Sequence, residues 1–474
     1  MELNKILRFA DERVFSKTGK HLDDLQEAIL KEALQGRKYA KIAQDRDCSE
    51  GYVRVVASEL WKILADALGE EVSKANVRSI LERAIIANNA NISPVIGRDH
   101  VTVNNNVSCF PEHMRSPVSD LPKPKPQDQP YLDLSDAPEV LKCYGRDEEL
   151  SILKRWVVSE ENDPRNNGNN NCAKIVAILG VSGMGKTTLA ISLAEEIKSN
   201  FNFIIYRDLS FSPTLETILN QLLKIFSLSS KMNENLDIET KISRILSYLR
   251  YYRCLILLDN VQEIFSPGKF AGQYQSVCQD YHLFLKKVSE VYHQSCFILI
   301  SSEKPREIAE LEQLNLPIFT LVLDGLGMAA KDIFISHQLS DQQTWERLIN
   351  IYQGNPLWLN IIATLIRELF GGKVGNFLQY EMPILDESLC WHLEQQFQRL
   401  SAREVVIVTQ LSKETEAIPL SDISNRVKLP LSDLINGIKS LVRRFILETK
   451  QQGDTTLFSL NSVMAQYVKT RQDL

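Results

Sequence analysis

Residues 173–188, "AKIVAILGVSGMGKTT", decide the fold of this chain. An apolar run of strand length leads directly into a glycine-rich turn that ends at Lys186 and Thr187. This spacing is the GxxxxGK[ST] pattern of a phosphate-binding loop, whose glycines let successive backbone N–H groups point at one phosphate. The helix expected to follow adds the positive end of its dipole. The stretch therefore predicts a strand, a loop and a helix in that order.

Two side chains of this loop have predicted chemical roles. Lys186 is expected to reach the β- and γ-phosphates, and Thr187 is expected to bind Mg²⁺. The plain alternative is a structural turn before a lysine-bearing helix, but the strand and helix patterns on either side favour the phosphate loop. We therefore expect ATP or ADP, with Mg²⁺, to bind against the whole loop, which comprises Gly180, Val181, Ser182, Gly183, Met184, Gly185, Lys186, Thr187 and Thr188.

A second stretch, "LILLDNVQ" at 255–262, ends an apolar strand with Asp259. We expect Asp259 to hold Mg²⁺ through water or through Thr187, although a strand-terminal aspartate can also cap a loop. Many ATPases have a second acid next, whereas this chain has Asn260. An amide can orient a water molecule but cannot accept its proton near neutral pH. Glu303, just beyond the next apolar strand, is the predicted substitute base.

Strand and helix patterns alternate around these motifs. The apolar runs "FIIYRDLS" (203–210), "CLILLDN" (254–260) and "CFILISS" (296–302) are separated by amphipathic segments. Near-continuous apolar strands indicate a parallel sheet covered by helices on both faces. We therefore predict an α/β fold with a nucleotide-binding domain at 141–327.

The remaining segments have different patterns. Residues 1–85 have helical periodicity, whereas 86–140 are rich in Asn, Pro and Ser and are predicted to be a flexible linker. Residues 328–390 are predicted to form a helical subdomain. Residues 391–474 contain three predicted helices and then "RRFILETKQQGDTTLFSLNS", two short strands around a Gly-Asp turn. That order predicts a winged helix.

Composition excludes several classes of protein. The net charge is −6, so no overall basic field suggests nucleic acid. None of the 8 cysteines forms a CxxC pair, which argues against a zinc site and fits a reducing compartment. No apolar run approaches the roughly 18 residues of a membrane span, and the N-terminus does not resemble a signal peptide. These features predict a cytoplasmic protein that does not enter a membrane.

With these motifs in place, residues 141–474 resemble the NB-ARC type of signal-transduction ATPase, a group that includes apoptosis activators, plant resistance proteins and bacterial regulators. "CYGRDEEL" resembles the segment near the adenine, which implies a role for Gly145 and Arg146. "LDGLGMAAKDIF" is similar to the segment that opens the helical subdomain. "YQGNPLWLNIIATLI" is similar to the Gly-x-Pro-Leu motif, which implies that Pro356 packs on the nucleotide base.

Three features depart from this resemblance. Ser302 stands at the expected position of an arginine that senses the γ-phosphate in the family. The Met-His-Asp motif falls on residues 460–462, so Asn461 replaces the histidine that contacts bound ADP; an amide can donate a hydrogen bond but carries no charge. Repeat arrays like those of many relatives are not expected, because the sequence ends soon after the predicted winged helix. Of these positions, Ser302 together with Asn260 implies slow ATP hydrolysis.

The N-terminal stretch 36–64, "GRKYAKIAQDRDCSEGYVRVVASELWKIL", resembles the helix-turn-helix of LuxR-type bacterial regulators. Ser49 is a suitable N-cap for a second helix. The apolar face of that helix would contain Tyr52, Val53, Val56, Leu60, Trp61 and Leu64. Acids and bases are nearly balanced over the module, which favours contact with a protein partner or with a second copy over DNA reading.

Two functions from different classes remain. The first is an ADP/ATP switch of intracellular signalling, in which nucleotide exchange controls conformation and oligomerisation. The alternative is an ATP-regulated transcription regulator whose helix-turn-helix reads DNA. A metabolic kinase is disfavoured by the helical and winged-helix segments. The winged helix is somewhat basic, and its Lys439, Arg443, Arg444, Lys450, Lys469 and Arg471 are expected to form a solvated face.

Overall fold

The computed structural model divides into two compact units, residues 1–115 and residues 116–474. In the second unit it describes residues 130–139, 143–158, 172–226, 236–314, 316–380 and 382–472. In the first unit it describes residues 7, 9–11, 14, 22, 24–34, 53, 56–57, 60–65, 72, 77 and 80–81.

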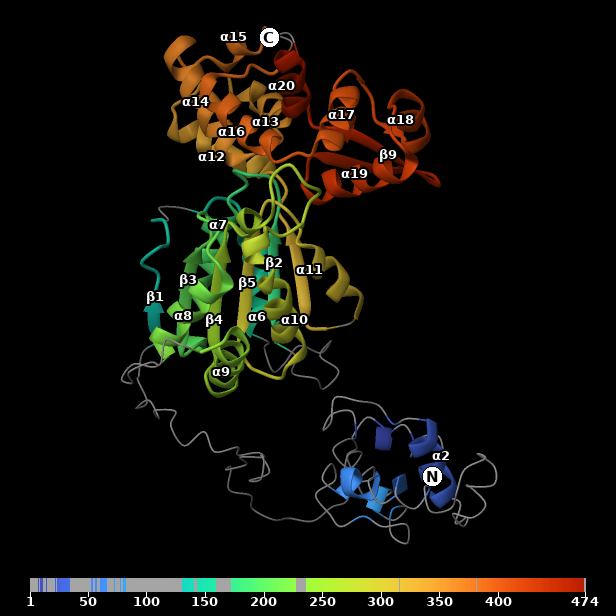
Figure 1. The fold of residues 1–474 in the computed structure, drawn as a ribbon. Coiled ribbons are helices and arrows are strands. Elements are labelled where there is room, and N and C mark those ends of the chain that lie inside the picture. The colour runs from blue at the N-terminus through green and yellow to red at the C-terminus, as the bar shows by residue number, and fades with distance from the viewer. Residues whose placement is uncertain are drawn as a thin grey trace, which may run out of the picture. The chain divides into compact units, whose positions relative to one another are not determined.

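The second unit is built on a six-stranded sheet in the order β1-β3-β4-β5-β2-β6, with every pairing parallel (Figure 1). The strands β2 to β5 are almost wholly buried, which explains why they are continuous apolar runs. The predicted parallel sheet is therefore confirmed. The strands are β1 (Tyr131–Asp133), β2 (Ile175–Leu179), β3 (Phe203–Asp208), β4 (Cys254–Asp259), β5 (Cys296–Ser301) and β6 (Ile318–Val322).

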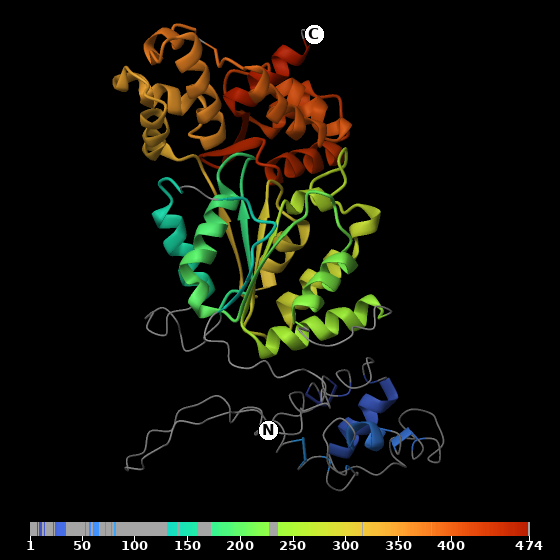
Figure 2. The same ribbon diagram turned by 90° about the vertical axis from the view of Figure 1, so that its left-hand side faces the viewer.

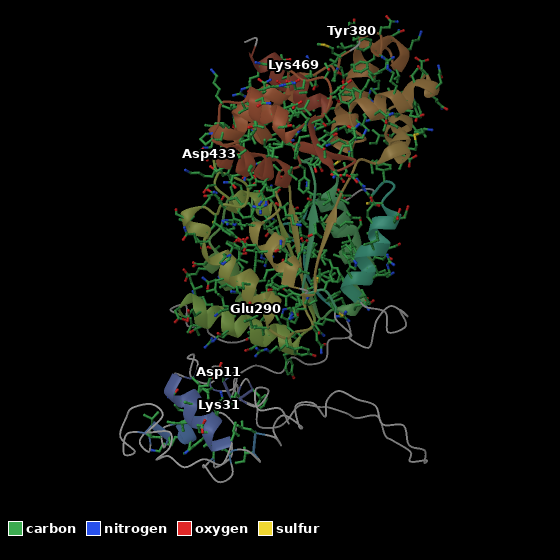
Figure 3. All side chains as sticks on the ribbon, turned by 90° about the vertical axis from the view of Figure 1, so that its right-hand side faces the viewer. Asp11, Lys31, Glu290, Tyr380, Asp433 and Lys469 are labelled. Carbon is green, nitrogen blue, oxygen red and sulfur yellow. The ribbon has the colours of Figure 1, made fainter. Side chains whose placement is uncertain are left out.

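Helices cover both faces of this sheet (Figure 2). One face packs against α6 (Asp147–Val158) and α7 (Lys186–Ile197). The other face packs against α8 (Leu215–Phe226), α9 (Ile238–Tyr251), α10 (Asp280–Glu290) and α11 (Arg306–Leu311). Side chains fill the space on both sides (Figure 3). Short 3-10 helices complete the domain: η2 (Lys198–Asn200), η3 (Val261–Ile264), η4 (Ser276–Cys278) and η5 (Glu312–Leu314).

The edge strand β1 corrects one predicted boundary. It lies within 86–140, which was predicted to be linker throughout, yet Tyr131 pairs with Phe203 of β3. Their rings are in contact, with centroids 5.7 Å apart, and Asp133 accepts a hydrogen bond of 2.6 Å from Arg207. A three-residue strand surrounded by Pro, Ser and Asp is too short to show a period. The nucleotide-binding sheet thus begins before residue 141.

The chain then forms a helical subdomain. Its helices are η6 (Gly327–Ala330), α12 (Lys331–Ser336), η7 (Gln342–Thr344), α13 (Trp345–Ile351), α14 (Pro356–Leu369), α15 (Val374–Phe377) and α16 (Glu387–Gln398). The predicted boundary between residues 390 and 391 falls inside α16. A single buried core extends from Leu326 to Val468, so this subdomain and the following one are packed together.

The last part has the element order predicted for a winged helix, and we call residues 402–472 the winged-helix subdomain. Helix, strand, two helices and a hairpin follow one another, and the hairpin turns at Gly453 and Asp454 as predicted. The small sheet is antiparallel, in the order β7-β9-β8. The elements are α17 (Ala402–Leu411), β7 (Ile418–Pro419), α18 (Leu420–Arg426), α19 (Leu431–Arg443), β8 (Leu447–Gln452), β9 (Thr455–Leu460) and α20 (Ser462–Gln472).

The first unit has a helical core of its own. Its helix α2 spans Asp24–Leu34, within the segment of predicted helical periodicity, and Ile29 and Leu34 are buried. The apolar residues predicted for the second helix of the helix-turn-helix, Val53, Val56, Leu60, Trp61 and Leu64, are also buried. Ser49 and Tyr52 lie outside the described residues. No helix in the described part of the chain is long and apolar enough to cross a membrane.

We expect Trp358→Ala to destabilise the helical subdomain strongly. Trp358 is fully buried in the shared core, and truncation of such a side chain costs about 3–5 kcal/mol. Thermal and urea unfolding should both show the loss. Trp391→Ala is the matched control, since Trp391 is 59% exposed on α16 and should change stability by about 0.5 kcal/mol at most. Equal melting of both variants would contradict this assignment of the core.

Candidate nucleotide-binding site

The phosphate loop has the predicted strand, loop and helix geometry. Strand β2 ends at Leu179, the loop turns, and α7 begins at Lys186. Gly180, Gly183 and Gly185 all have positive φ angles, which residues with a Cβ seldom adopt. At Gly183 a Cβ atom would also lie 2.7 Å from the Cβ of Leu357. The loop therefore requires glycine both for its turn and for contact with α14.

Lys186 is held inside the loop. Its Nζ donates hydrogen bonds of 2.9 Å to the carbonyl oxygens of Gly180 and Val181. Burial lowers the pKa of this amine from 10.5 to about 8, and the nearby carboxylate of Asp259 opposes the decrease. Because the acceptors of this ammonium group among the described residues are backbone carbonyls, a phosphate oxygen would be a stronger partner for it.

Asp259 lies next to Thr187, as predicted for a shared magnesium site. Its Oδ2 accepts hydrogen bonds of 2.7 Å from the Thr187 hydroxyl and from the Tyr206 hydroxyl, and its Oδ1 accepts one of 2.7 Å from the backbone N–H of Asn260. A hydroxyl and a carboxylate are hard oxygen ligands, so these two residues fit Mg²⁺, which takes its other ligands from water and phosphate. The sequence interpretation missed Tyr206, whose only signal is its place near the end of β3.

The side chain of Asn260 donates a hydrogen bond to an acid at the end of the neighbouring strand. Its backbone is left-handed (φ 55°), and its Nδ2 donates to Asp208 Oδ1 at 2.8 Å and to Ser210 Oγ at 3.0 Å. Asp208 ends β3 and pairs directly with Asp259 in the sheet register. A carboxylate therefore lies beside the position where the second acid of β4 is missing. The sequence interpretation did not select it, although "YRD" ends an apolar strand as "LLD" does.

Glu303 is placed differently from what a catalytic base requires. It is 2% exposed, and its Oε1 accepts hydrogen bonds from Arg399 Nε at 2.7 Å and from Arg444 Nη1. Arg444 also donates to Glu404 Oε1 at 3.2 Å. We call these four residues the Glu303 cluster. In this arrangement the carboxylate joins the nucleotide-binding domain to residues beyond it, since Arg399 follows α16 and Arg444 follows α19.

Arg146 donates hydrogen bonds to the phosphate loop and to the segment before the helical subdomain. It is 5% exposed, and its Nη2 donates to the carbonyl oxygens of Met184 at 3.1 Å and Asp324 at 2.7 Å. Its Nη1 pairs with Glu149. Gly145 packs closely on Ala329, where an added Cβ would come within 2.2 Å. These two predicted site residues thus connect the phosphate loop to the start of the helical subdomain.

The helical subdomain reaches the phosphate loop through Asn355. This fully buried residue donates from Nδ2 to the Ser182 carbonyl at 2.9 Å. Its Oδ1 caps α14 by accepting from the backbone N–H groups of Leu357 and Trp358. Pro356 is the first residue of that helix. The sequence interpretation selected Pro356 and missed Asn355, although Asn before Pro is a typical helix start.

Asn461 caps a different helix. It is buried, and its Oδ1 accepts a hydrogen bond of 2.7 Å from the backbone N–H of Met464 at the start of α20. The next residue, Ser462, donates to the carbonyl of Ile351 at the end of α13. Contact of Asn461 or Pro356 with nucleotide stays a prediction.

Two family models match the chain. The NB-ARC domain matches residues 165–267, and the vWA-MoxR associated protein N-terminal HTH matches residues 1–84. An uncharacterized WD repeat-containing protein of Nostoc is 35% identical over 355 residues. That match covers 72% of this chain and 27% of the relative, so the chain spans about a quarter of that protein's length.

Solved structures are similar over part of the chain and at low identity. A STAND protein with a tetratricopeptide repeat sensor from Pyrococcus horikoshii is 17% identical, with a TM-score of 0.35, and the match covers 70% of this chain and 43% of the other. A Walker-type ATPase of Pyrococcus abyssi is 14% identical, with a TM-score of 0.45, and the match covers 72% and 98%.

The two family matches agree with the geometry of the site. The NB-ARC match contains the phosphate loop and Asp259, which the structure brings together through Thr187. The N-terminal match coincides with the predicted helix-turn-helix module. The chain therefore contains an NB-ARC domain and an N-terminal helix-turn-helix domain of the vWA-MoxR associated type.

Proposed function

We propose that this protein is an ADP/ATP-binding switch of cytoplasmic signalling, in which nucleotide exchange controls conformation and oligomerisation. The observation that carries the proposal is that both later subdomains contact the nucleotide-binding elements through polar groups. Asn355 holds the Ser182 carbonyl of the phosphate loop, and Arg399 and Arg444 hold Glu303 at the end of β5. A change at the phosphates can therefore bias the arrangement of three parts of the chain.

A continuous set of hydrogen bonds joins Asn260 to Arg399. Gln262 Nε2 donates to Asn260 Oδ1 at 3.1 Å, and Gln262 Oε1 accepts from the backbone N–H of Ser302 at 3.1 Å. Arg399 donates to the Gln262 carbonyl and pairs with Glu263 at 3.1 Å. Asn260, which would orient the attacking water, is thus two residues before Gln262, whose carbonyl oxygen accepts a hydrogen bond from Arg399. Such a network is the physical link that a nucleotide-dependent switch needs.

The Glu303 cluster would make the present arrangement an all-or-none state. Glu303, Arg444 and Glu404 are each nearly inaccessible to solvent. Removing one partner from a buried ion pair costs about 3–5 kcal/mol, because the other charge is left without compensation. Partial separation of the winged-helix subdomain is therefore unfavourable, and full separation would return all the charges to water.

We propose that ATP hydrolysis is slow and uses Asp208 where it occurs. Asn260 cannot accept the proton of the attacking water. Glu303 is committed to two arginines, whereas Asp208 is partly exposed at the same edge of the sheet and bonded to Asn260. Asp259, Thr187 and the phosphate loop would hold the nucleotide and Mg²⁺.

The helix-turn-helix match supports the alternative of a transcription regulator that reads DNA. The balanced charge of the module favours a protein partner or a second copy instead. A gel shift with genomic fragments at low and moderate salt separates the two, because contacts with DNA phosphates make binding depend strongly on salt. Salt-sensitive retardation that depends on bound nucleotide would favour the regulator.

Lys186→Ala should weaken ADP and ATP binding by at least about 100-fold, since charged hydrogen bonds to phosphate are lost. Titration calorimetry with each nucleotide measures the effect. Lys224→Ala, which removes an exposed lysine from α8 of the same domain, should bind normally. Undiminished binding by the Lys186 variant would show that the nucleotide binds elsewhere.

ADP affinity should decrease above pH 8. The pKa of Lys186 is lowered by burial to about 8, and a bound phosphate would raise it towards its ordinary value. Binding therefore takes up close to one proton at pH 9 and almost none by this group at pH 7, and affinity falls up to about tenfold per unit above pH 8. Calorimetry in two buffers of different ionisation enthalpy counts the protons. No uptake at pH 9 would contradict the role of Lys186.

Asp208→Asn and Glu303→Gln should affect different steps: the first should slow ATP hydrolysis, and the second should speed ADP release. The Asp208 variant should hydrolyse ATP at least about tenfold more slowly and keep its ADP affinity, since it loses a proton acceptor. The Glu303 variant should retain hydrolysis within a few-fold and release ADP at least about tenfold faster, because two ion pairs are lost. Phosphate release and the dissociation of a fluorescent ADP measure the two rates.

Glu290→Gln, at an exposed position of the same domain, is the control for both variants. If the Glu303 variant loses hydrolysis and the Asp208 variant does not, then Glu303 is the base.

A further inference from the structure

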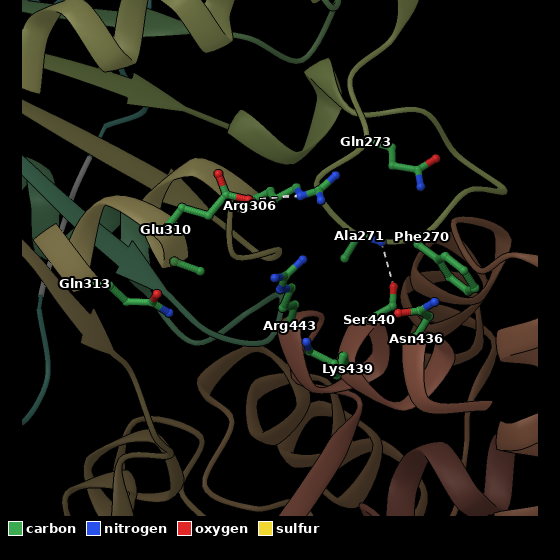
Figure 4. A pocket seen from close by; sticks show the side chains of 11 residues that line it. Phe270, Ala271, Gln273, Arg306, Glu310, Gln313, Asn436, Lys439, Ser440 and Arg443 are labelled. Carbon is green, nitrogen blue, oxygen red and sulfur yellow. Dashed lines mark hydrogen bonds and ion pairs between the residues drawn. The ribbon is translucent and has the colours of Figure 1, made fainter. Parts of the chain in front are cut away.

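The interface between the nucleotide-binding domain and the winged-helix subdomain contains a cavity of about 440 Å³, which we call the interface cavity (Figure 4). One wall consists of residues 270–273, α11 and η5, and the other is α19. It adjoins the Glu303 cluster, because Ser440 lines the cavity and also bonds to Glu404 and to the backbone N–H of Ala271. Its lining residues are Phe270, Ala271, Gln273, Arg306, Ala309, Glu310, Gln313, Asn436, Lys439, Ser440 and Arg443.

The interface cavity is separate from the phosphate loop. Helix α11 packs through Ile308 and Leu311 into the core on one face of the sheet. Helix α7, which follows the phosphate loop, packs into the core on the opposite face. None of the phosphate-loop residues lines the cavity. A ligand bound here would therefore be additional to the nucleotide.

The lining is positively charged. It contains three cations, Arg306, Lys439 and Arg443, and one acid, Glu310. Glu310 accepts a hydrogen bond of 3.2 Å from Nε of Arg306. Within the described ranges, the side chains of Lys439 and Arg443 form no hydrogen bond or ion pair with protein groups. They are four residues apart on α19, where like charges destabilise a helix.

Arg443 differs in this respect from the other arginines of its region. Between residues 399 and 472, Arg399 and Arg444 hold Glu303, and the remaining arginines except Arg443 also have carboxylate partners: Arg403 with Asp433, Arg426 with Glu414 and Arg471 with Glu394. In this described segment only Arg443 lacks a carboxylate partner, and it lines the interface cavity together with Lys439. Of the predicted solvated basic face, Lys450 and Lys469 are exposed, whereas Arg444 and Arg471 pair with carboxylates and Lys439 and Arg443 line the interface cavity.

We propose that the interface cavity binds a small phosphate-bearing anion. Guanidinium groups match phosphate oxygens in a bidentate geometry, and a lysine adds a point charge. The amides of Gln273, Gln313 and Asn436 provide further donors and acceptors around the cations. The volume lies in the range of small-molecule sites.

Such an anion would stabilise the present arrangement. Arg306 belongs to the nucleotide-binding domain, whereas Lys439 and Arg443 belong to the winged-helix subdomain. A ligand that contacts both walls binds only when they are together and shifts the equilibrium towards that state. If the proposed switch holds ADP in this arrangement, the bound anion should also slow ADP release.

The test is calorimetric titration of the full chain, saturated with ADP, with inorganic pyrophosphate. We expect one saturable site. The double variant Lys439→Gln/Arg443→Gln should bind pyrophosphate on the order of 100-fold more weakly. The control Lys450→Gln/Lys469→Gln removes the same charge from exposed positions of the same subdomain and should bind as the parent does. ADP affinity, measured first on each sample, shows that the variants are folded and tests the proposed function separately.

Three results would overturn the proposal: no saturable pyrophosphate binding, equal weakening in both double variants, or equally tight binding of sulfate. The last would indicate an adventitious ion only. If pyrophosphate binds as expected, it should also slow the dissociation of a fluorescent ADP from the parent and not from the Lys439/Arg443 variant.

Discussion

The site depends on the parallel pairing of β3, β4, β5 and β2, because that pairing brings the carboxyl ends of four strands to one edge of the sheet. Asp208, Asp259, Glu303 and the phosphate loop all lie at or just beyond these strand ends. Parallel strands require crossover connections, so residues that meet at this edge are far apart in the sequence. The edge is where nucleotides bind in sheets of this kind. Here it is also where the helical and winged-helix subdomains make their polar contacts.

Buried charge explains why these contacts are specific. A carboxylate such as Glu303 is not stable in a protein interior without partners, and its partners come from Arg399 and Arg444. Asp259 has three hydrogen-bond donors of its own and therefore does not compete for them. The acids at this edge are thus divided by their environment. Asp259 faces the phosphate loop, Asp208 faces Asn260, and Glu303 faces the later subdomains.

The parts of the fold that follow from local sequence were predictable. The strand, loop and helix at 173–197, the buried strands and the helical periodicity are properties of short segments. The contact of Thr187 with Asp259 also followed, because the spacing of the motif and the end of a strand define it. The edge strand β1 was not predictable, since three residues within a Pro-rich stretch have no period and are recognised only by pairing with β3.

The role of Glu303 could not be predicted for a different reason. Its partners are 96 and 141 residues away along the chain, and nothing in either local pattern distinguishes Arg399 or Arg444 from a solvated arginine. The place of Asp208 could in principle have been predicted, because two apolar strands that both end in Asp should place these acids side by side. Asn355 was overlooked for the opposite reason: its helix-capping role is a complete local explanation and conceals the second bond to Ser182.

The two groups of cations on the winged-helix subdomain differ in their partners, and this difference bears on control of the proposed switch. Arg444 pairs with acids within the protein, so its contribution to the present arrangement needs no ligand from outside. Among the described residues Lys439 and Arg443 have no carboxylate partner, so their contribution would depend on the proposed external anion. A closed state held only by internal pairs would respond to nucleotide alone. Since cations without acidic partners lie at the same interface, closure would respond to nucleotide and to a second anion together, and the coupling between the two would be reciprocal.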